Sequence, residues 1–235
     1  MVTTAYDSKG SQEYDEKRFT SPQGKLFNAL EMEQLRRVAD RLSVPSNILE
    51  VGCGTGRFVA YLSGVGHYVR GLDSSPHMLA IVKRKLAQCK AVEFDLGEGA
   101  CLPYAGNQFD FVYSIRTVNQ TASREYALRM IREMIRVVHP GGVVLIEFTN
   151  NLRPHRKGYG GVRLSVLDIG RIAKENANLK VLGTGGVLFF SQMVLERVPS
   201  WLLPLFGRVD RFCCRLLPQF AARCYVTLIK GEGLV

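Results

Sequence analysis

The sequence lacks the patterns of a membrane-spanning or disulfide-rich secreted protein. No apolar run in its 235 residues approaches the ~20 residues needed to span a bilayer. The N-terminus is polar and has no apolar segment of the kind that a signal peptide carries. The six cysteines show no CxxC spacing, which favours reduced, mostly buried thiols over disulfides or a metal site. We therefore expect a cytoplasmic protein without a bound metal.

Acidic residues are few relative to basic ones. The chain has 31 Lys and Arg against 21 Asp and Glu, a formal net charge of +10. Such an excess favours anionic partners: phosphates, acidic small molecules, nucleic acid or anionic lipid. Many ordinary enzymes are equally basic, so the charge alone does not choose among these partners. With 46% hydrophobic and 22% charged residues, the composition is that of a globular protein.

Apolar periodicity divides the chain into a short arm and one domain. Residues 1–20 have no periodic apolar pattern and predict a flexible N-terminal arm. Residues 21–235 predict a single α/β domain, which opens with an amphipathic helix over 21–42. Strands then alternate with helical patterns, the clearest helix lying at 123–138. The expected strands are 47–52, 67–72, 91–94, 109–115, 142–148, 179–190 and 223–230.

Alternation of this kind predicts a doubly wound, mostly parallel sheet with helices on both faces. Two helix starts are marked locally. Ser75 is an expected N-cap with Pro76 at the first helical position, and Ser165 with Asp168 resembles a capping box that opens a helix to about Asn176.

The stretch ILEVGCGTGRF, 48–58, joins an apolar strand to a glycine loop and then to a helix. Such a loop presents backbone N–H groups and the positive end of a helix dipole to a ligand. It differs from the dinucleotide fingerprint G-x-G-x-x-G, because Arg57 stands near the place of the last glycine. Asp73, at the end of the next strand, can accept hydrogen bonds from ribose hydroxyls. Up to this point a nicotinamide cofactor and S-adenosylmethionine both remain open.

Three further segments complete a set of five landmarks that closely resembles the class I S-adenosylmethionine-dependent methyltransferases. The set covers about 48–148, and the landmarks follow one another in the order and with the spacing of that family. They are the first motif at Glu50 to Gly56, the acid Asp73, the pair Asp95 and Leu96, the segment LPYAGNQFD at 102–110, and Pro-Gly-Gly after His139, which replaces the usual Lys or Arg.

The resemblance implies a seven-stranded sheet whose last strand, 223–230, is antiparallel, and S-adenosylmethionine as cofactor. It also implies that the glycine loop holds the methionine and ribose side of the cofactor, that Asp95 and Leu96 hold the adenine, and that the N-terminal arm folds over the site. The implied cofactor residues are Tyr14, Arg18, Glu50, Gly52, Cys53, Gly54, Gly56, Asp73, Ser74, Met78, Asp95, Leu96, Ser114 and Arg116.

Methyl transfer needs mainly correct positioning of the two reactants, because the cofactor carries the activated methyl group. A general base is needed only when the acceptor must lose a proton. Expected acceptor contacts are Asn119, Gln120, Arg156 and Tyr159, with His155 as the candidate base. We expect 150–222 to supply the loops on the acceptor side.

The expected acceptor is a small or medium-sized metabolite, hydrophobic or anionic. Two alternatives remain open: an RNA or nucleotide methyltransferase, and a protein that binds S-adenosylmethionine without catalysis. The sequence carries neither the Asn-Pro-Pro-Tyr nor the Pro-Cys pattern of nucleic-acid methylation. The acceptor atom and the oligomeric state are not indicated.

The segment 200–218, SWLLPLFGRVDRFCCRLLP, predicts an amphipathic helix with an apolar stripe and three arginines on another face. Trp201 stands at its start. A basic amphipathic helix of this kind lies on a membrane surface or closes a site as a lid. Alternatively, it is a surface helix that packs on the edge of the sheet. The stripe consists of Leu202, Leu205, Val209, Phe212 and Leu216, and the arginines are Arg208, Arg211 and Arg215.

Overall fold

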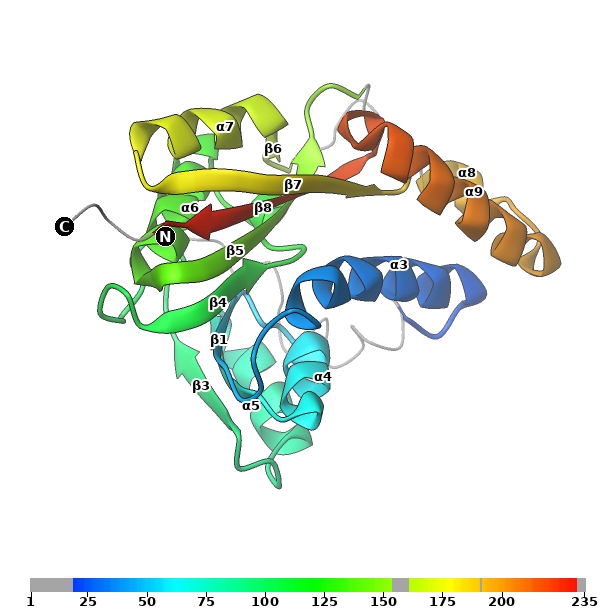
Figure 1. The fold of residues 1–235 in the computed structure, drawn as a ribbon. Coiled ribbons are helices and arrows are strands. Elements are labelled where there is room, and N and C mark those ends of the chain that lie inside the picture. Colours follow the sequence, from blue (N-terminus) through cyan, green and yellow to red (C-terminus); the bar gives the residue numbers. More distant parts are fainter. Residues whose placement is uncertain (1–18, 154–160, 191, 232–235) are drawn as a thin grey trace.

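The computed structural model describes residues 19–153, 161–190 and 192–231. Its centre is a twisted sheet in the strand order β3-β2-β1-β4-β5-β8-β7, with the short β6 paired to β5 (Figure 1). β8 pairs antiparallel with both β5 and β7, so the predicted sheet and its antiparallel last strand are confirmed. The strands are β1 (Asn47–Val51), β2 (Tyr68–Asp73), β3 (Val92–Leu96), β4 (Phe109–Ser114), β5 (Val138–Asn150), β6 (Arg163–Leu164), β7 (Leu179–Val187) and β8 (Arg223–Lys230).

Helices cover both faces of the sheet, as predicted. Successive strand residues point to opposite faces, so Ile48 belongs to one hydrophobic core and Leu49 to the other. The first core is closed by α3 (Pro22–Ala39), α4 (Arg57–Val65) and α5 (Pro76–Lys85). The second is closed by α6 (Arg124–Val137) and α7 (Val166–Glu175).

The two helix N-caps predicted from the sequence are present in the structure. The Ser75 side chain accepts a hydrogen bond from the N–H of Met78, and Ser165 with Asp168 forms a complete capping box. Boundaries were less well predicted. α3 ends at Ala39 rather than near residue 42, and β7 ends at Val187 rather than near residue 190.

The segment after β7 forms two helices, α8 (Gln192–Glu196) and α9 (Leu203–Leu216). α9 is flanked by the 3-10 turns η2 (Ser200–Leu202) and η3 (Pro218–Phe220), and it packs against α3 and β7. Figure 1 shows both helices projecting past the end of β7. In the part of the chain that the structure describes, no helix combines the length and apolar character required to cross a bilayer.

The predicted helix over 200–218 is present and packs on the sheet edge, because β7 is an outermost strand, but its apolar stripe faces away from this contact. Leu205, Val209, Phe212 and Leu216 are solvent-exposed. The buried side of α9 is made instead by Leu203, Gly207, Asp210 and Cys214. The alternative of a surface helix on the sheet edge agrees with this contact, which is made by these four residues and not by the predicted stripe.

All six cysteines are free thiols. Cys53, Cys214 and Cys224 are buried, Cys101 is exposed and the remaining two are half-buried. The predicted burial of the thiols thus holds for three of the six.

Candidate functional site

The glycine loop between β1 and α4 has a backbone that requires glycine. Gly52, Gly54 and Gly56 have φ values of 82°, 53° and 78°, a region that residues with a side chain rarely adopt. At Gly52 a Cβ atom would lie 2.2 Å from Oγ1 of Thr117, and at Gly56 it would lie 2.1 Å from Val82. The loop can take its course between β4 and α5 only because these positions lack side chains.

A cavity of about 130 Å³ opens beside this loop, at the carboxyl ends of β1, β2 and β4. The chain winds from β1 toward β3 on one side and from β4 toward β7 on the other, so the cavity lies at the point where the strand order reverses. Open α/β sheets bind their ligands at such a switch point. Nine of the predicted site residues line it: Glu50, Gly52, Cys53, Gly54, Asp73, Ser74, Met78, Arg116 and Gln120.

Asp73 is held in a fixed orientation at this cavity. Its Oδ2 accepts the N–H of Gly54 at 2.8 Å, and its Oδ1 accepts the N–H of Ser75 at 2.9 Å. Burial raises the pKa of the Asp73 carboxyl, although these N–H groups lower it in part. A carboxylate has about four acceptor positions, so two backbone donors leave capacity for ligand hydroxyls.

Glu50 is the second carboxyl of the cavity, and its pKa is raised as well. It is 2% exposed, and its Oε2 accepts the hydroxyl of Tyr113 at 2.9 Å. Burial raises the pKa of Glu50 to about 8, so the side chain is mainly protonated at neutral pH. Burial, and after it the nearby Asp73, also raises the pKa of the Cys53 thiol. Cys53 is thus not a reactive thiolate.

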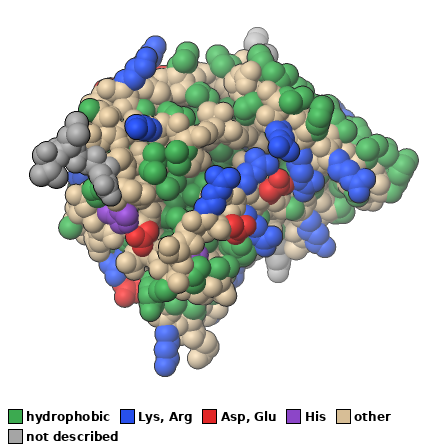
Figure 2. Space-filling view, in the orientation of Figure 1, with side chains coloured by type: hydrophobic (Ala, Val, Ile, Leu, Met, Phe, Trp, Pro, Cys, Tyr) green, Lys and Arg blue, Asp and Glu red, His purple; other side chains and the backbone are tan. Residues whose placement is uncertain are grey.

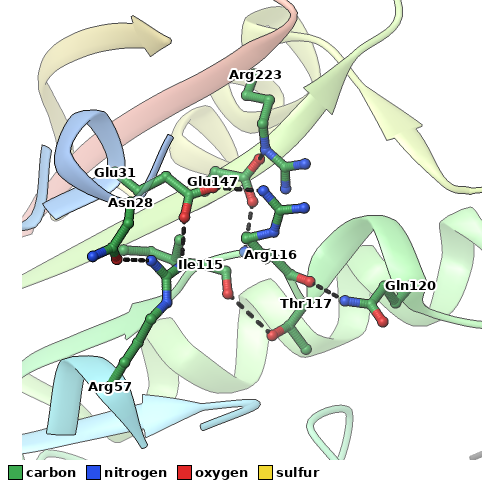
Figure 3. A network of polar contacts seen from close by, with 9 residues as sticks. All are labelled: Asn28, Glu31, Arg57, Ile115, Arg116, Thr117, Gln120, Glu147 and Arg223. Atoms are coloured by element: carbon green, nitrogen blue, oxygen red, sulfur yellow. Dashed lines mark hydrogen bonds and ion pairs between the residues drawn. The ribbon is translucent and has the colours of Figure 1, made fainter. Parts of the chain in front are cut away.

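Behind the cavity, two buried carboxylates and three arginines form a continuous polar network (Figure 3). Glu31 of α3 is 2% exposed and pairs with both Arg57 and Arg116, the latter at 2.7 Å. The backbone N–H of Arg116 donates to Oε2 of Glu147 at 2.7 Å. The other oxygen of Glu147 lies 2.6 Å from Nε of Arg223, so the network runs from α3 through the cavity wall to β8.

Arg116 occupies a strained position within this network. Its φ is 64°, which is uncommon for a residue with a side chain. Contacts at both its backbone and its guanidinium hold it there, and Figure 3 shows Gln120 directed at its carbonyl oxygen. Strain that the surrounding contacts maintain is a feature of ligand sites.

Several cavity residues were not predicted from the sequence: Thr55, Arg57, Phe58, Thr117, Thr121, Tyr126 and Met130. Glu31, Glu147 and Arg223 of the network were missed as well. One signal was available, since Glu147 interrupts the otherwise apolar strand VVLIEF and a buried strand rarely carries a charge without a partner.

Five predicted residues lie elsewhere in the described structure. Asp95 accepts the hydroxyl of Tyr104 at 2.8 Å, and Leu96 is exposed. The hydroxyl of Ser114 is fully buried and donates to the carbonyl of Val51 at 2.8 Å. Gly56 caps α4, and Asn119 lies in the turn η1 (Val118–Gln120). Gly97 and Gly99, which follow Leu96, line the cavity in place of the predicted pair.

The remaining predicted residues lie outside the described part of the chain. They are Tyr14 and Arg18 of the N-terminal arm, and His155, Arg156 and Tyr159 of the loop after β5. Their roles stay predictions.

The fold and the switch-point cavity define a Rossmann-like α/β protein that binds a nucleotide-type ligand. Residues 49–146 match the family model of a methyltransferase domain. This match and the fold support the class I S-adenosylmethionine-dependent methyltransferase that the motifs predict.

Curated relatives share the central part of the chain. It is 38% identical over 124 residues to a demethylmenaquinone methyltransferase of Bacillus mycoides, a match that covers 48% of this chain and 50% of the relative. It is 32% identical over 117 residues to a norajmaline N-methyltransferase of Rauvolfia serpentina, covering 47% and 39%. The chain thus spans half or less of the length of these two relatives.

Solved structures share the fold over nearly the whole chain. A phosphoethanolamine N-methyltransferase of Haemonchus contortus, in complex with S-adenosylhomocysteine, superposes with a TM-score of 0.67 at 19% identity. This match covers 97% of this chain and 58% of that one. A protein of Pyrococcus horikoshii superposes with a TM-score of 0.65 at 15% identity, covering 97% and 100%. At these identities the likeness concerns the fold alone.

Proposed function

We propose that the protein transfers the methyl group of S-adenosylmethionine to a small or medium-sized acceptor molecule. The observation that carries this proposal is the oriented Asp73 carboxylate, which lines the switch-point cavity and is hydrogen-bonded to the glycine loop. A carboxylate at the end of the second strand is placed to accept the two hydroxyls of an adenosine ribose. The family match and the S-adenosylhomocysteine complex of a structural neighbour support the same cofactor.

In this proposal each cavity residue has a limited task. Asp73 accepts the ribose hydroxyls, Gly52 and Gly54 allow the ligand to approach the backbone closely, and Met78 packs on the adenine. Glu50, mainly protonated, has a hydroxyl hydrogen to donate toward the methionine end of the ligand. The bound cofactor supplies an activated methyl group, which an acceptor displaces in line. The protein contributes positioning and the exclusion of water.

The acceptor that we propose is anionic, hydrophobic or both. Arg57 and Arg116 line the cavity, and guanidinium groups bind carboxylates and phenolates through paired hydrogen bonds. Relatives named for demethylmenaquinone and norajmaline support a small organic acceptor. Acceptors that reside in a membrane are included, because 200–218 exposes apolar side chains. Asn119, Gln120, Arg156 and Tyr159 remain the proposed acceptor contacts, and His155 the proposed base.

The test is a thermal-shift titration with S-adenosylmethionine, S-adenosylhomocysteine and NAD side by side. A ligand at 100 times its dissociation constant adds about 2.7 kcal/mol of stability, which such a titration detects. We expect a shift with the two adenosyl sulfur compounds and none with NAD. The opposite pattern would make the protein a dehydrogenase.

Methyl transfer itself is tested with radiolabelled S-adenosylmethionine and a panel of demethylated quinones, phenols, aliphatic amines and carboxylic acids, with transfer RNA as a further arm. We expect label in an organic-soluble small molecule. Label in the RNA would favour the nucleic-acid alternative, and cofactor binding with no label in any arm would favour a non-catalytic binding protein.

A further inference from the structure

α9 has one buried side and, opposite to it, an apolar side that no described residue covers. Leu205, Val209, Phe212 and Leu216 follow one another at intervals of four, three and four, which places them on one side of the helix. We call these four residues the outer row. The opposite side, with Leu203, Gly207, Asp210 and Cys214, is already buried.

Large side chains extend this exposed surface at both ends of the helix. Trp201 is 76% exposed, Phe212 is 64% exposed and Leu216 is 61% exposed. Phe220, just after the helix, is 51% exposed. Figure 2 shows hydrophobic side chains along the end of the molecule where α8 and α9 project, with Lys or Arg side chains among them. Contiguous apolar surface of this kind marks a site of contact with a partner or a membrane.

The exposed charges on α9 are positive. Arg208 and Arg215 are exposed beside the outer row, and within the described residues neither has an acidic partner. Arg211 is neutralised by Glu33 at 2.7 Å. The one acidic residue of α9, Asp210, is 1% exposed and accepts the backbone N–H groups of Leu188 and Phe190. The surface is therefore apolar and cationic with no exposed acid of its own.

We infer that this surface docks on a bilayer that contains anionic phospholipid. Apolar side chains of an interfacial helix enter the boundary between headgroups and acyl chains, while arginines beside them reach the phosphates. A second copy of the chain fits less well. Two α9 helices that packed by their outer rows would bring Arg208 and Arg215 toward their own symmetry mates, without an acid to pair with them.

α3 connects this surface to the cavity. Its Glu33 pairs with Arg211 of α9. Asn28 and Glu31, within two turns of Glu33 on the same helix, contact Arg57 at the cavity wall. A docked α9 would thus hold the cavity close to the lipid, which suits an acceptor dissolved in the membrane. That use rests on the proposed function, whereas the docking itself does not depend on it.

Trp201 is the single tryptophan of the sequence and reports directly on the docking. We would titrate the full chain with vesicles of phosphatidylcholine, with and without phosphatidylglycerol, and record tryptophan emission together with co-sedimentation. With anionic vesicles we expect a blue shift and sedimentation, both weakened by salt. With phosphatidylcholine alone we expect neither.

Variants separate the two components of the surface. The double variant Leu205→Ser, Phe212→Ser should abolish the blue shift, and Arg208→Gln and Arg215→Gln should each lower the affinity for anionic vesicles about fivefold. The matched controls are Leu167→Ser, an exposed leucine on α7, and Lys83→Gln, an exposed cation on α5. Neither control should change vesicle binding.

An unchanged emission spectrum with anionic vesicles, or unchanged binding in the double variant, would overturn the inference. The inference would also be overturned if the protein formed a dimer that does not bind vesicles and that dissociates in the variant Phe212→Ser. The outer row would then dock on a second copy of the chain. S-adenosylhomocysteine binding, measured by calorimetry on the same proteins, should be equal in wild type and double variant. If neither protein bound S-adenosylhomocysteine, the result would count against the proposed function and not against the docking.

Discussion

The cavity wall buries charged side chains, whereas helix α9 exposes apolar ones. At the cavity, charged side chains are buried and form ion pairs with one another: Glu31 and Glu147 lie among Arg57, Arg116 and Arg223. On α9, large apolar side chains face solvent while the one acid is buried. Burial therefore does not follow residue polarity in either region. Buried charges and exposed apolar side chains both lower the stability of the isolated chain. Proteins keep such features mainly at functional sites, and we therefore assign ligands to these two regions.

The largest effect is expected at the centre of the buried network. Glu31→Ala would leave Arg57 and Arg116 without their shared carboxylate in a buried setting, and should destabilise the protein by about 3–5 kcal/mol. Urea unfolding measures this loss. The control is Glu33→Ala on the same helix, whose partners Arg37 and Arg211 are largely solvent-exposed, and it should cost less than about 1 kcal/mol. Equal losses would mean that the network is no more than a surface ion pair.

The next effect is expected at the buried acid of α9. Asp210→Ala removes the acceptor of the Leu188 and Phe190 N–H groups, at 3.1 and 3.3 Å, and should cost about 2–3 kcal/mol. Asp210→Asn keeps one acceptor oxygen and should recover part of this loss. A stability equal to wild type in Asp210→Ala would show that α9 is held by its apolar contacts alone.

A pH-dependent effect is expected from Glu50. Its folded-state pKa of about 8 lies above the ordinary value of 4.5, so between these two values the folded state holds a proton that the unfolded state has lost. The unfolding free energy from this group therefore falls as pH rises, by at most about 1.4 kcal/mol per pH unit. Glu50→Gln should remove this slope, so the unfolding free energy of the variant should rise relative to that of the wild type between pH 5 and 8. Urea unfolding at each pH measures this difference. Parallel profiles for the two proteins would contradict the raised pKa.

The smallest effect is expected on the outer row. Leu205→Ser and Phe212→Ser remove apolar side chains that already face water, so each should change the unfolding free energy by no more than about 0.5 kcal/mol. Thermal unfolding without lipid tests this. A loss of several kcal/mol in either variant would mean that the outer row is packed in the native protein. α9 would then no longer differ from the cavity wall by exposing apolar side chains.

The sequence predicted the regions in which local signals and tertiary structure agree. Glycines at positions that need positive φ, helix caps at Ser75 and Ser165, and the alternation of apolar segments identified the sheet and the glycine-loop side of the cavity. The polar network was not predicted, because Glu31, Glu147 and Arg223 lie far apart in the chain and meet only through tertiary packing. The outer row was seen as a stripe, but periodicity alone does not tell which side of a helix is buried.

The central claim is that Asp73 binds the ribose of an adenosyl ligand. We would measure it by calorimetry as a double-mutant cycle, with wild type and Asp73→Ala each titrated with S-adenosylhomocysteine and with its 2′,3′-dideoxy analogue. The cycle separates hydroxyl recognition from any distortion of the glycine loop, since distortion affects both ligands alike. We predict that removing the hydroxyls costs the wild type about 1.5–3 kcal/mol of binding and the variant close to nothing. Equal costs in the two proteins would contradict the assignment of Asp73 and, with it, the cofactor site.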